Sequence, residues 1–353
     1  MLELVARKEA SRFMLWLTPV LAVILTMLSG LALFALLGKD PFEAVRVIFV
    51  EPLLDPFSRT ELLVKGAPLV LIAIGLSFGF RAGIWNIGAE GQFTIGALAA
   101  GAVALAFWNI EGMWLLPLMA LAGAAGGAAW AMIPAWLRIR FNANEILVSL
   151  MLVYVAELLL SAMVGGPLRN PDGFNFPESR MFHDSATLPI IIEGSRAHVG
   201  ALAALGAVVI AYVLLHRHLF GFQVRLFGQA PRAARFAGFR EARIVAACLG
   251  LSGALAGLAG MFEASGPVGQ LVPALPSGYG FTAIIVAFLG RLHPVGILLA
   301  GAVMALTYIG GETAQMAMNL PGAAINVFQG MLLFFLLGID VLVNYRIRLR
   351  RTV

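Results

Sequence analysis

The sequence predicts an all-α integral membrane protein, a bundle of about ten transmembrane helices. Of its 353 residues 60% are apolar and only 12% are charged, whereas a soluble domain carries about 25% charged residues. The apolar residues gather in runs long enough to cross roughly 30 Å of hydrocarbon as a helix. The chain shows no alternation of apolar and polar residues in ~10-residue pieces, which is the pattern of a membrane β-barrel. Composition and run length therefore both favour a helical bundle.

The apolar runs place ten spans along the chain. We expect them at 13–37, 62–80, 84–107, 114–136, 145–164, 198–215, 244–266, 279–290, 295–311 and 323–343. The first run is too long for the apolar core of a cleaved signal sequence, which is roughly 7 to 15 residues. The eighth run is short and lies between Gly278 and Gly290. Asn144 fits the cap of the helix in the fifth span, with Glu145 in its first turn, where the helix dipole favours an acid.

Ten spans divide the single transmembrane domain, 1–353, into two halves of five, 1–164 and 165–353. Because five is odd, the second half runs opposite to the first. This inverted repeat is typical of transporters, and short or glycine-broken segments at matching places in two halves indicate a path near the membrane midplane.

The cationic residues predict the orientation. With the N-terminus inside, the cytoplasmic segments hold 17 of the 24 Lys and Arg residues. By the positive-inside rule both termini are therefore expected in the cytoplasm. The net charge of +5 is explained by these loops rather than by a nucleic-acid surface. The two long external segments, 38–61 and 165–197, are either connectors or surfaces that a second protein contacts.

Several kinds of catalytic site are missing from the sequence. A nucleotide-binding P-loop needs the pattern G-x-x-x-x-G-K-[ST], and none of the three lysines, Lys8, Lys39 and Lys65, lies in it. No clustered His and Cys set predicts a metal site, and the single cysteine, Cys248, lies in an apolar run. The chain therefore cannot be its own ATPase, and no catalytic residue, metal or cofactor is expected in it.

Polar residues within the third span are the first candidate site. The stretch 79–101, GFRAGIWNIGAEGQFTIGALAAG, carries Asn86, Glu90 and Gln92. On a helix Asn86 and Glu90 are four residues apart and share a face. Polar groups at membrane depth either line a path or join helices to one another, and both interpretations stay open. We add Trp85, a stacking surface, and the deep carboxyl group of Glu263 as further path candidates.

The second candidate site is the polar, arginine-rich loop 216–243. Within it, Pro231 fits the first turn of a helix and Gly238 fits its end, which predicts a two-turn helix between them. Such a helix is marginal alone in water. It either lies on lipid headgroups or packs against a partner protein.

These stretches together resemble the permease subunits of bacterial ABC importers for monosaccharides, nucleosides and branched-chain amino acids. GIWNIGAEGQ, in 83–92, is similar to the motif of the nucleoside and simple-sugar subgroup. GQAPRAARFAGF, SGALAGLAG and IIVAFLGRLHPVGILLAG are similar to the family's second half. The resemblance covers about 60–340, and its motifs are specific in combination.

The resemblance implies a multi-pass permease in the bacterial inner membrane, in contact with lipid. Its expected partners are an ATPase subunit that binds ATP and Mg²⁺, a second and related permease chain, and an extracytoplasmic binding protein. The loop helix would dock on the ATPase, and the residues assigned to it are Gly228, Pro231, Arg232, Ala234, Arg235, Phe236 and Gly238. The family often has Asn where this chain has Ala230.

Nucleosides are the expected substrates, with simple sugars second and flavin-like ligands open. The rival from another class is an ion-coupled secondary transporter using Glu90, Glu157 or Glu263. It would need no partner and no arginine-rich loop. A channel and an intramembrane enzyme find less support, because no filter segment and no nucleophile with a base is present.

Overall fold

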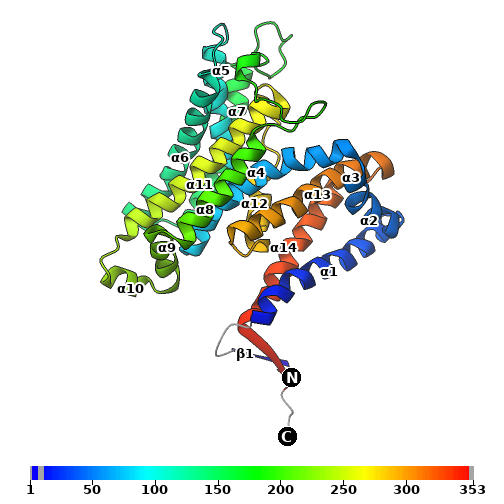
Figure 1. Ribbon diagram of the computed structural model, residues 1–353, viewed down its shortest axis with the longest axis vertical. Coiled ribbons are helices and arrows are strands. Elements are labelled where there is room, and N and C mark those ends of the chain that lie inside the picture. The colour runs from blue at the N-terminus through cyan, green and yellow to red at the C-terminus, as the bar shows by residue number, and fades with distance from the viewer. Residues whose placement is uncertain (1, 7–11, 350–353) are drawn as a thin grey trace. The chain divides into compact units, whose positions relative to one another are not determined.

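The computed structural model describes residues 2–6 and 12–349, and it is helical apart from two short terminal strands. The helices are α1 Arg12–Leu36, α2 Pro41–Phe49, α3 Glu51–Leu54, α4 Pro56–Arg81, α5 Ala89–Ala106, α6 Leu115–Phe141, α7 Glu145–Gly165, α8 Gly200–His216, α9 Leu219–Gln229, α10 Pro231–Phe236, α11 Glu241–Glu263, α12 Tyr279–Leu289, α13 Pro294–Met318 and α14 Gly322–Asn344. A 3₁₀ turn η1 (Asp184–Ala186) and a π-helical turn η2 (Ala264–Val268) complete the set. Figure 1 shows these elements along the chain.

The predicted integral membrane class is confirmed, and the prediction of ten spans is confirmed in part. Among the described residues, eight helices are long and apolar enough to cross a membrane. A ninth span arises if α8 and α9, which meet at 68°, are counted as one broken span. At the place of the eighth predicted span lies α12, an apolar helix of only 11 residues.

The chain forms two compact units. Unit 1 contains Met1–Arg59 and Leu306–Val353, and unit 2 contains Thr60–Ala305. In unit 1, α1 packs against α14, where the rings of Phe34 and Phe328 stack at 6.3 Å between centroids. The predicted all-helical class needs a small correction here, because β1 (Leu2–Ala6) pairs antiparallel with β2 (Tyr345–Leu349). The two ends of the described chain therefore lie together, and their cytoplasmic location stays a prediction.

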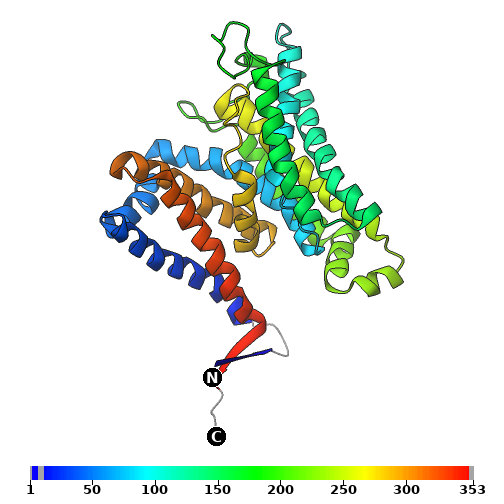
Figure 2. The ribbon, with the colours of Figure 1, turned by 180° about the vertical axis from the view of Figure 1, so that it is seen from behind.

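Unit 2 is built on α5, α6 and α11, which lie side by side in Figure 2. Their backbones approach through glycines. A Cβ atom placed on Gly257 of α11 would lie 2.2 Å from the carbonyl oxygen of Gly123 and 2.9 Å from Cα of Gly127, both on α6. A Cβ on Gly96 of α5 would lie 2.1 Å from Cα of Gly257. Small residues thus allow close packing where apolar burial between helices is no driving force.

The predicted start of the third span is wrong. Residues 84–88 are not helical, and α5 begins only at Ala89. The break follows first from Gly83, whose φ of 72° ends α4. It follows also from Gly88, because a Cβ atom placed there would lie only 2.7 Å from the carbonyl oxygen of Ser149. Asn86 and Glu90 therefore do not share a helix face.

The helix ends predicted from capping residues are confirmed. Asn144 caps α7, since its Oδ1 accepts hydrogen bonds from the backbone N–H groups of Ile146 and Leu147. Pro231 is the first residue of α10, and Gly238 follows its end with φ 81°.

Candidate functional site

The non-helical segment 84–88 before α5 is held by a buried amide pair. Asn86 Nδ2 donates to Gln92 Oε1 at 2.9 Å, and Gln92 Nε2 donates back to Asn86 Oδ1 at 3.0 Å. The same Asn86 nitrogen also donates to Ser252 Oγ on α11 at 2.9 Å, and Asn86 Oδ1 accepts from the backbone N–H of Gly88. All three side chains are buried. The pair joins the 84–88 segment, α5 and α11, so it positions the start of α5.

Glu90 connects the N-termini of two discontinuous helices. Its carboxylate accepts a hydrogen bond from the backbone N–H of Gly278 at 2.8 Å and another from that of Gly280. These N–H groups belong to the first turn of α12, where the helix dipole favours a negative charge. The backbones also touch, because a Cβ on Gly280 would lie 2.2 Å from the backbone nitrogen of Glu90. A side chain of α5 therefore caps α12 across 188 residues of sequence.

Glu263 lies at the end of α11, apart from the amide pair. Its buried carboxyl group interacts with the phenol of Tyr279 and with the charges of Lys65 and Arg196. The ring of Tyr279 packs edge-on against Phe93 of α5, and the ammonium group of Lys65 lies 5.7 Å from its centre. Glu263 is thus connected to α5 indirectly. Its carboxyl group contacts Tyr279, the first residue of α12, and the ring of Tyr279 packs against Phe93 of α5.

An ion pair ties the segment 165–197 to α4. Arg196 donates from Nε to Glu61 Oε1 at 3.0 Å and from Nη2 to Glu61 Oε2 at 2.6 Å. Glu61 is almost fully buried, whereas the arginine is about half exposed. Segment 165–197 is also pinned to the α5–α6 turn, because Trp108 Nε1 donates to the carbonyl oxygen of Met181. It is therefore an ordered covering rather than a loose connector.

His198, in the residues before α8, gives a pH prediction. Its Nδ1 accepts the backbone N–H of Gly200 at 3.1 Å, and its ring packs against Phe262. Burial lowers the pKa of His198 from its usual 6.5, and the charge of Glu61 only partly opposes this shift. Below pH ~6.5 the unfolded chain therefore binds more protons than the folded one, so stability is lost as pH falls.

We expect the melting temperature of the purified protein to fall on acidification from about pH 7.5 to about 5.5, and to fall less in His198→Gln. A glutamine keeps an acceptor for Gly200 but does not titrate. His183→Gln, which changes a partly exposed imidazole in segment 165–197, is the control and should keep the full pH dependence. An equal fall in His198→Gln and the parent would remove His198 as the cause.

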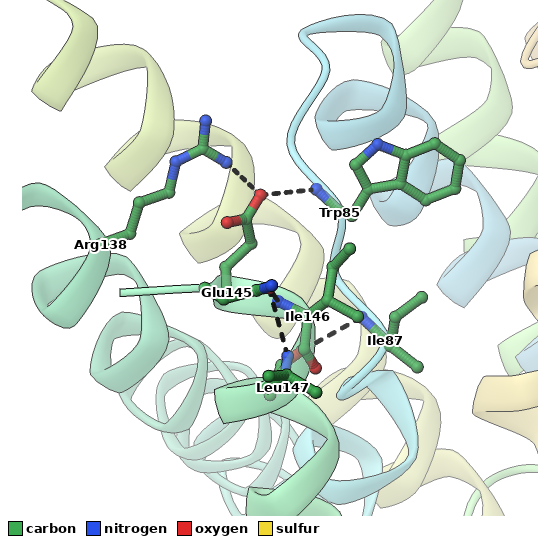
Figure 3. A network of polar contacts seen from close by, with 8 residues as sticks. Trp85, Ile87, Arg138, Glu145, Ile146 and Leu147 are labelled. Carbon is green, nitrogen blue, oxygen red and sulfur yellow. Dashed lines mark hydrogen bonds and ion pairs between the residues drawn. The ribbon is translucent and has the colours of Figure 1, made fainter. Parts of the chain in front are cut away.

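Trp85 is directed away from the amide pair, toward an aromatic group. Its ring lies 5.1 Å from that of Phe80 at the end of α4 and 5.7 Å from that of Phe288 at the end of α12, and the indole is 41% exposed. Its backbone N–H donates to Glu145 Oε1 at 3.3 Å. The same carboxylate pairs with Arg138 of α6 (Figure 3). The hydrogen bond from its backbone to Glu145 therefore helps to hold Trp85 in place at the break between α4 and α5.

Figure 3 also shows why the break is fixed on its α7 side. Ser149 Oγ accepts the backbone N–H of Ile87 at 3.3 Å and itself donates to the carbonyl oxygen of Ile146. Neither Ser149 nor Arg138 is among the predicted site residues, and Glu145 is predicted only as an acid in the first turn of its helix. Their link to Trp85 and Ile87 depends on the break in α5, which the apolar run concealed.

The arginine-rich loop forms two helices, α9 and α10. On α10, Ala234 is buried against its own unit, and Phe236 is 94% exposed. Arg235 pairs with Glu241 at the start of α11 at 2.8 Å, which holds the far end of α10. Next to this pair an open groove of about 520 Å³ is lined by Arg138, Ile139, Arg140, Phe141, Asn142, Glu241, Ala242 and Val245. The loop thus presents an apolar tip among cationic side chains.

The structure brings the predicted residues into separate groups. Asn86 and Gln92 contact each other, whereas Glu90, Trp85 and Glu263 each have other partners. Those of the arginine-rich loop lie together on and around α10, with Gly228 near the end of α9. Among the residues that the structure describes, no three His, Cys, Asp or Glu side chains are arranged to hold a metal ion.

The chain is similar in sequence to known transport proteins. The family model described as the permease component of the branched-chain amino acid transport system matches residues 58–337. The glucose ABC transporter permease protein TsgB13 of Haloferax volcanii is 38% identical, over 98% of this chain and 93% of its own length. No solved structure matches.

Two further relatives come from Bacillus subtilis, and both are guanosine ABC transporter permease proteins. NupP is 29% identical over 90% of this chain and 92% of its own length. NupQ is 30% identical over 70% of this chain and 81% of its own length. With the match over 58–337, these similarities show that the chain belongs to the family of the branched-chain amino acid transport system permease component, and that it is a permease subunit of an ABC transporter.

Proposed function

We propose that this chain forms half of the translocation path of an ABC importer for a solute built on a sugar ring. The observation that carries the proposal is α10, a short helix with Phe236 exposed beside Arg232 and Arg235. Such a surface suits a groove on an ATPase subunit better than bulk water. Membership of the family implies that ATPase and a second permease, and it favours the ABC mechanism over an ion-coupled carrier.

The sugar ring is what glucose and guanosine have in common. The 38% identity to a glucose permease over nearly the whole chain favours a simple sugar. The two guanosine permeases support a nucleoside as the second candidate, which is the substrate expected from the sequence motif. Because Bacillus subtilis has both NupP and NupQ, these relatives also support a related chain, rather than a second copy of this chain, as the second permease.

The path itself would run beside the break between α4 and α5 and the start of α12. Two discontinuous helices meet there, as in transporters whose path lies at the midplane. Trp85 offers a partly exposed ring for stacking on a sugar face or a base. The amide pair of Asn86 and Gln92 and the carboxyl groups of Glu90 and Glu263 would shape the wall. The chain would lie in the bacterial inner membrane. An extracytoplasmic binding protein would deliver the solute to it.

In the transport cycle, ATP binding would bring the two ATPases together and move α10 with them. The bundle would then exchange which side is open, which requires two packings of similar energy and ligands that favour one of them. ATP and Mg²⁺ would be bound by the ATPase, and none is needed in this chain.

The test is uptake into vesicles that contain the chain, its ATPase and its second permease. We expect ATP-dependent uptake of labelled glucose or labelled guanosine. The unlabelled compound that reduces this uptake by competition identifies the solute. Arg235→Glu should abolish uptake and ATPase co-purification, because it reverses the charge beside Phe236. Gly238→Trp should do the same, since its φ of 81° strains any side chain.

Arg140→Glu, at an exposed arginine of α6, is the charge-matched control and should retain both. Uptake by this chain alone under a proton gradient, indifferent to the α10 variants, would overturn the proposal. Uptake of neither compound, with the ATPase bound, would overturn the substrate class alone.

A further inference from the structure

The loop that carries α10 touches the cytoplasmic end of α4 at two points. A Cβ on Gly228 of α9 would lie 2.0 Å from the carbonyl oxygen of Arg81, so the backbone of α9 rests directly on the last residue of α4. One turn before Arg81, the ring centroid of Phe78 of α4 lies 6.0 Å from that of Phe220 at the start of α9. A displacement of α9 therefore reaches Arg81 without an intervening side chain.

The side chain of Arg81 reaches across to a third element. Its Nε and Nη2 donate to the carbonyl oxygen of Leu292 at 3.0 and 2.8 Å, which joins residues 211 positions apart. A guanidinium fork makes both bonds in one fixed orientation, which a lysine ammonium group does not. Arg81 is thus fixed by α9 through its backbone and fixes the α12–α13 turn through its side chain.

The turn that accepts these bonds has an unusual backbone. Arg291 and Leu292 both have φ of 55°, the left-handed region that residues other than glycine seldom adopt. The turn closes α12 by hydrogen bonds from Leu292 N to the carbonyl oxygen of Ala287 and from Arg291 N to that of Phe288. Strained backbones of this kind persist only where their surroundings hold them. Arg81 supplies part of that hold.

The other end of α12 is fixed by Glu90, so this short helix is held at both termini by groups from α4 and α5. Phe80 adds a ring contact to Phe288 at 5.1 Å, next to the turn. The chain of contacts therefore runs from α9 through Arg81 and the turn to the helix whose start lies at the proposed path.

We propose that Arg81 is the positioning residue that transmits movement of the α9–α10 loop to α12. This proposal rests on the proposed function, in which α10 docks on the ATPase. Arg81 contacts neither the solute nor the ATPase. Its loss should leave ATP hydrolysis running while α12 no longer follows the loop.

The experiment measures solute transported per ATP hydrolysed, in the complete reconstituted transporter. For Arg81→Gln we expect ATPase binding and ATP hydrolysis within about twofold of the parent, and a transport ratio reduced about tenfold or more. Arg81→Lys should fall between the two, because it keeps the charge but loses the fork. Gly228→Ala should also lower the ratio, since its Cβ would push α9 off Arg81.

Arg140→Gln is the matched control, an arginine near the same end of the bundle that forms no such link, and its ratio should equal the parent's. An unchanged ratio in Arg81→Gln would overturn the proposal. Loss of ATPase binding in both Arg81 variants would also overturn it, by showing a structural role. Failure of the proposed function looks different, because Arg235→Glu would then leave ATPase binding intact.

Discussion

Gly257→Leu is expected to prevent stable folding of unit 2. The glycine lies where the backbones of α5, α6 and α11 meet, and a Cβ there would be 2.2 Å from the carbonyl oxygen of Gly123. The nearest residues, Gly123 and Gly127 of α6, have no side chain that could move aside, so the helices must separate. Overpacking costs roughly 1 to 3 kcal/mol where side chains can adjust, and we expect at least about 3 kcal/mol here. For a unit of this size, that corresponds to a loss of about 6 °C or more in melting temperature.

The measurement is the thermal unfolding of detergent-purified protein, together with the yield of monodisperse material. Gly250→Leu is the matched control on the same helix, because a Cβ at Gly250 meets only the sulfur of Met132 at 3.7 Å. It should cost little. A melting temperature for Gly257→Leu within about 2 °C of the Gly250→Leu value would show that the three helices separate easily.

Glu90→Ala should have the second largest effect. It removes the acceptor for the backbone N–H groups of Gly278 and Gly280, and each buried donor left unpaired costs about 1 to 3 kcal/mol. We therefore expect a loss of about 2 to 5 kcal/mol and frayed packing at the start of α12. Transport should fall in parallel, because α12 loses one of its two attachments. Glu90→Gln keeps one acceptor oxygen and should be intermediate.

Thermal unfolding and uptake are measured on the same preparations. Glu157→Ala is the control, since that half-buried carboxyl group of α7 caps no helix. Full uptake and unchanged stability in Glu90→Ala would contradict the capping role. Loss of uptake in Glu90→Ala with undiminished stability would instead indicate a direct role for the carboxylate in the path.

The sequence was sufficient where structure depends on neighbours along the chain. Apolar run length placed the long helices, and Asn144, Pro231 and Gly238 marked helix ends correctly, because capping and proline geometry act within one turn. The short α12 was also visible from its flanking glycines. These features require no knowledge of distant contacts.

The sequence was insufficient where a segment's conformation is set by partners far away. Residues 84–88 are apolar enough to continue a helix, yet they are not helical because Ser149, Glu145 and Ser252 bind them from other helices. The bond from Arg81 to Leu292 joins residues 211 apart, and no spacing in one sequence predicts such a pair. The left-handed turn it supports is equally invisible, since neither Arg nor Leu favours that conformation.

The glycine contacts among α5, α6 and α11 also limit how the protein can move. Side chains between helices normally act as a compliant layer, which takes up small rotations by changing rotamer. Here the backbones of Gly96, Gly127 and Gly257 lie in contact and that layer is missing. The three helices must therefore turn as one rigid body. The movements of a transport cycle must then come from the elements outside this group of three helices.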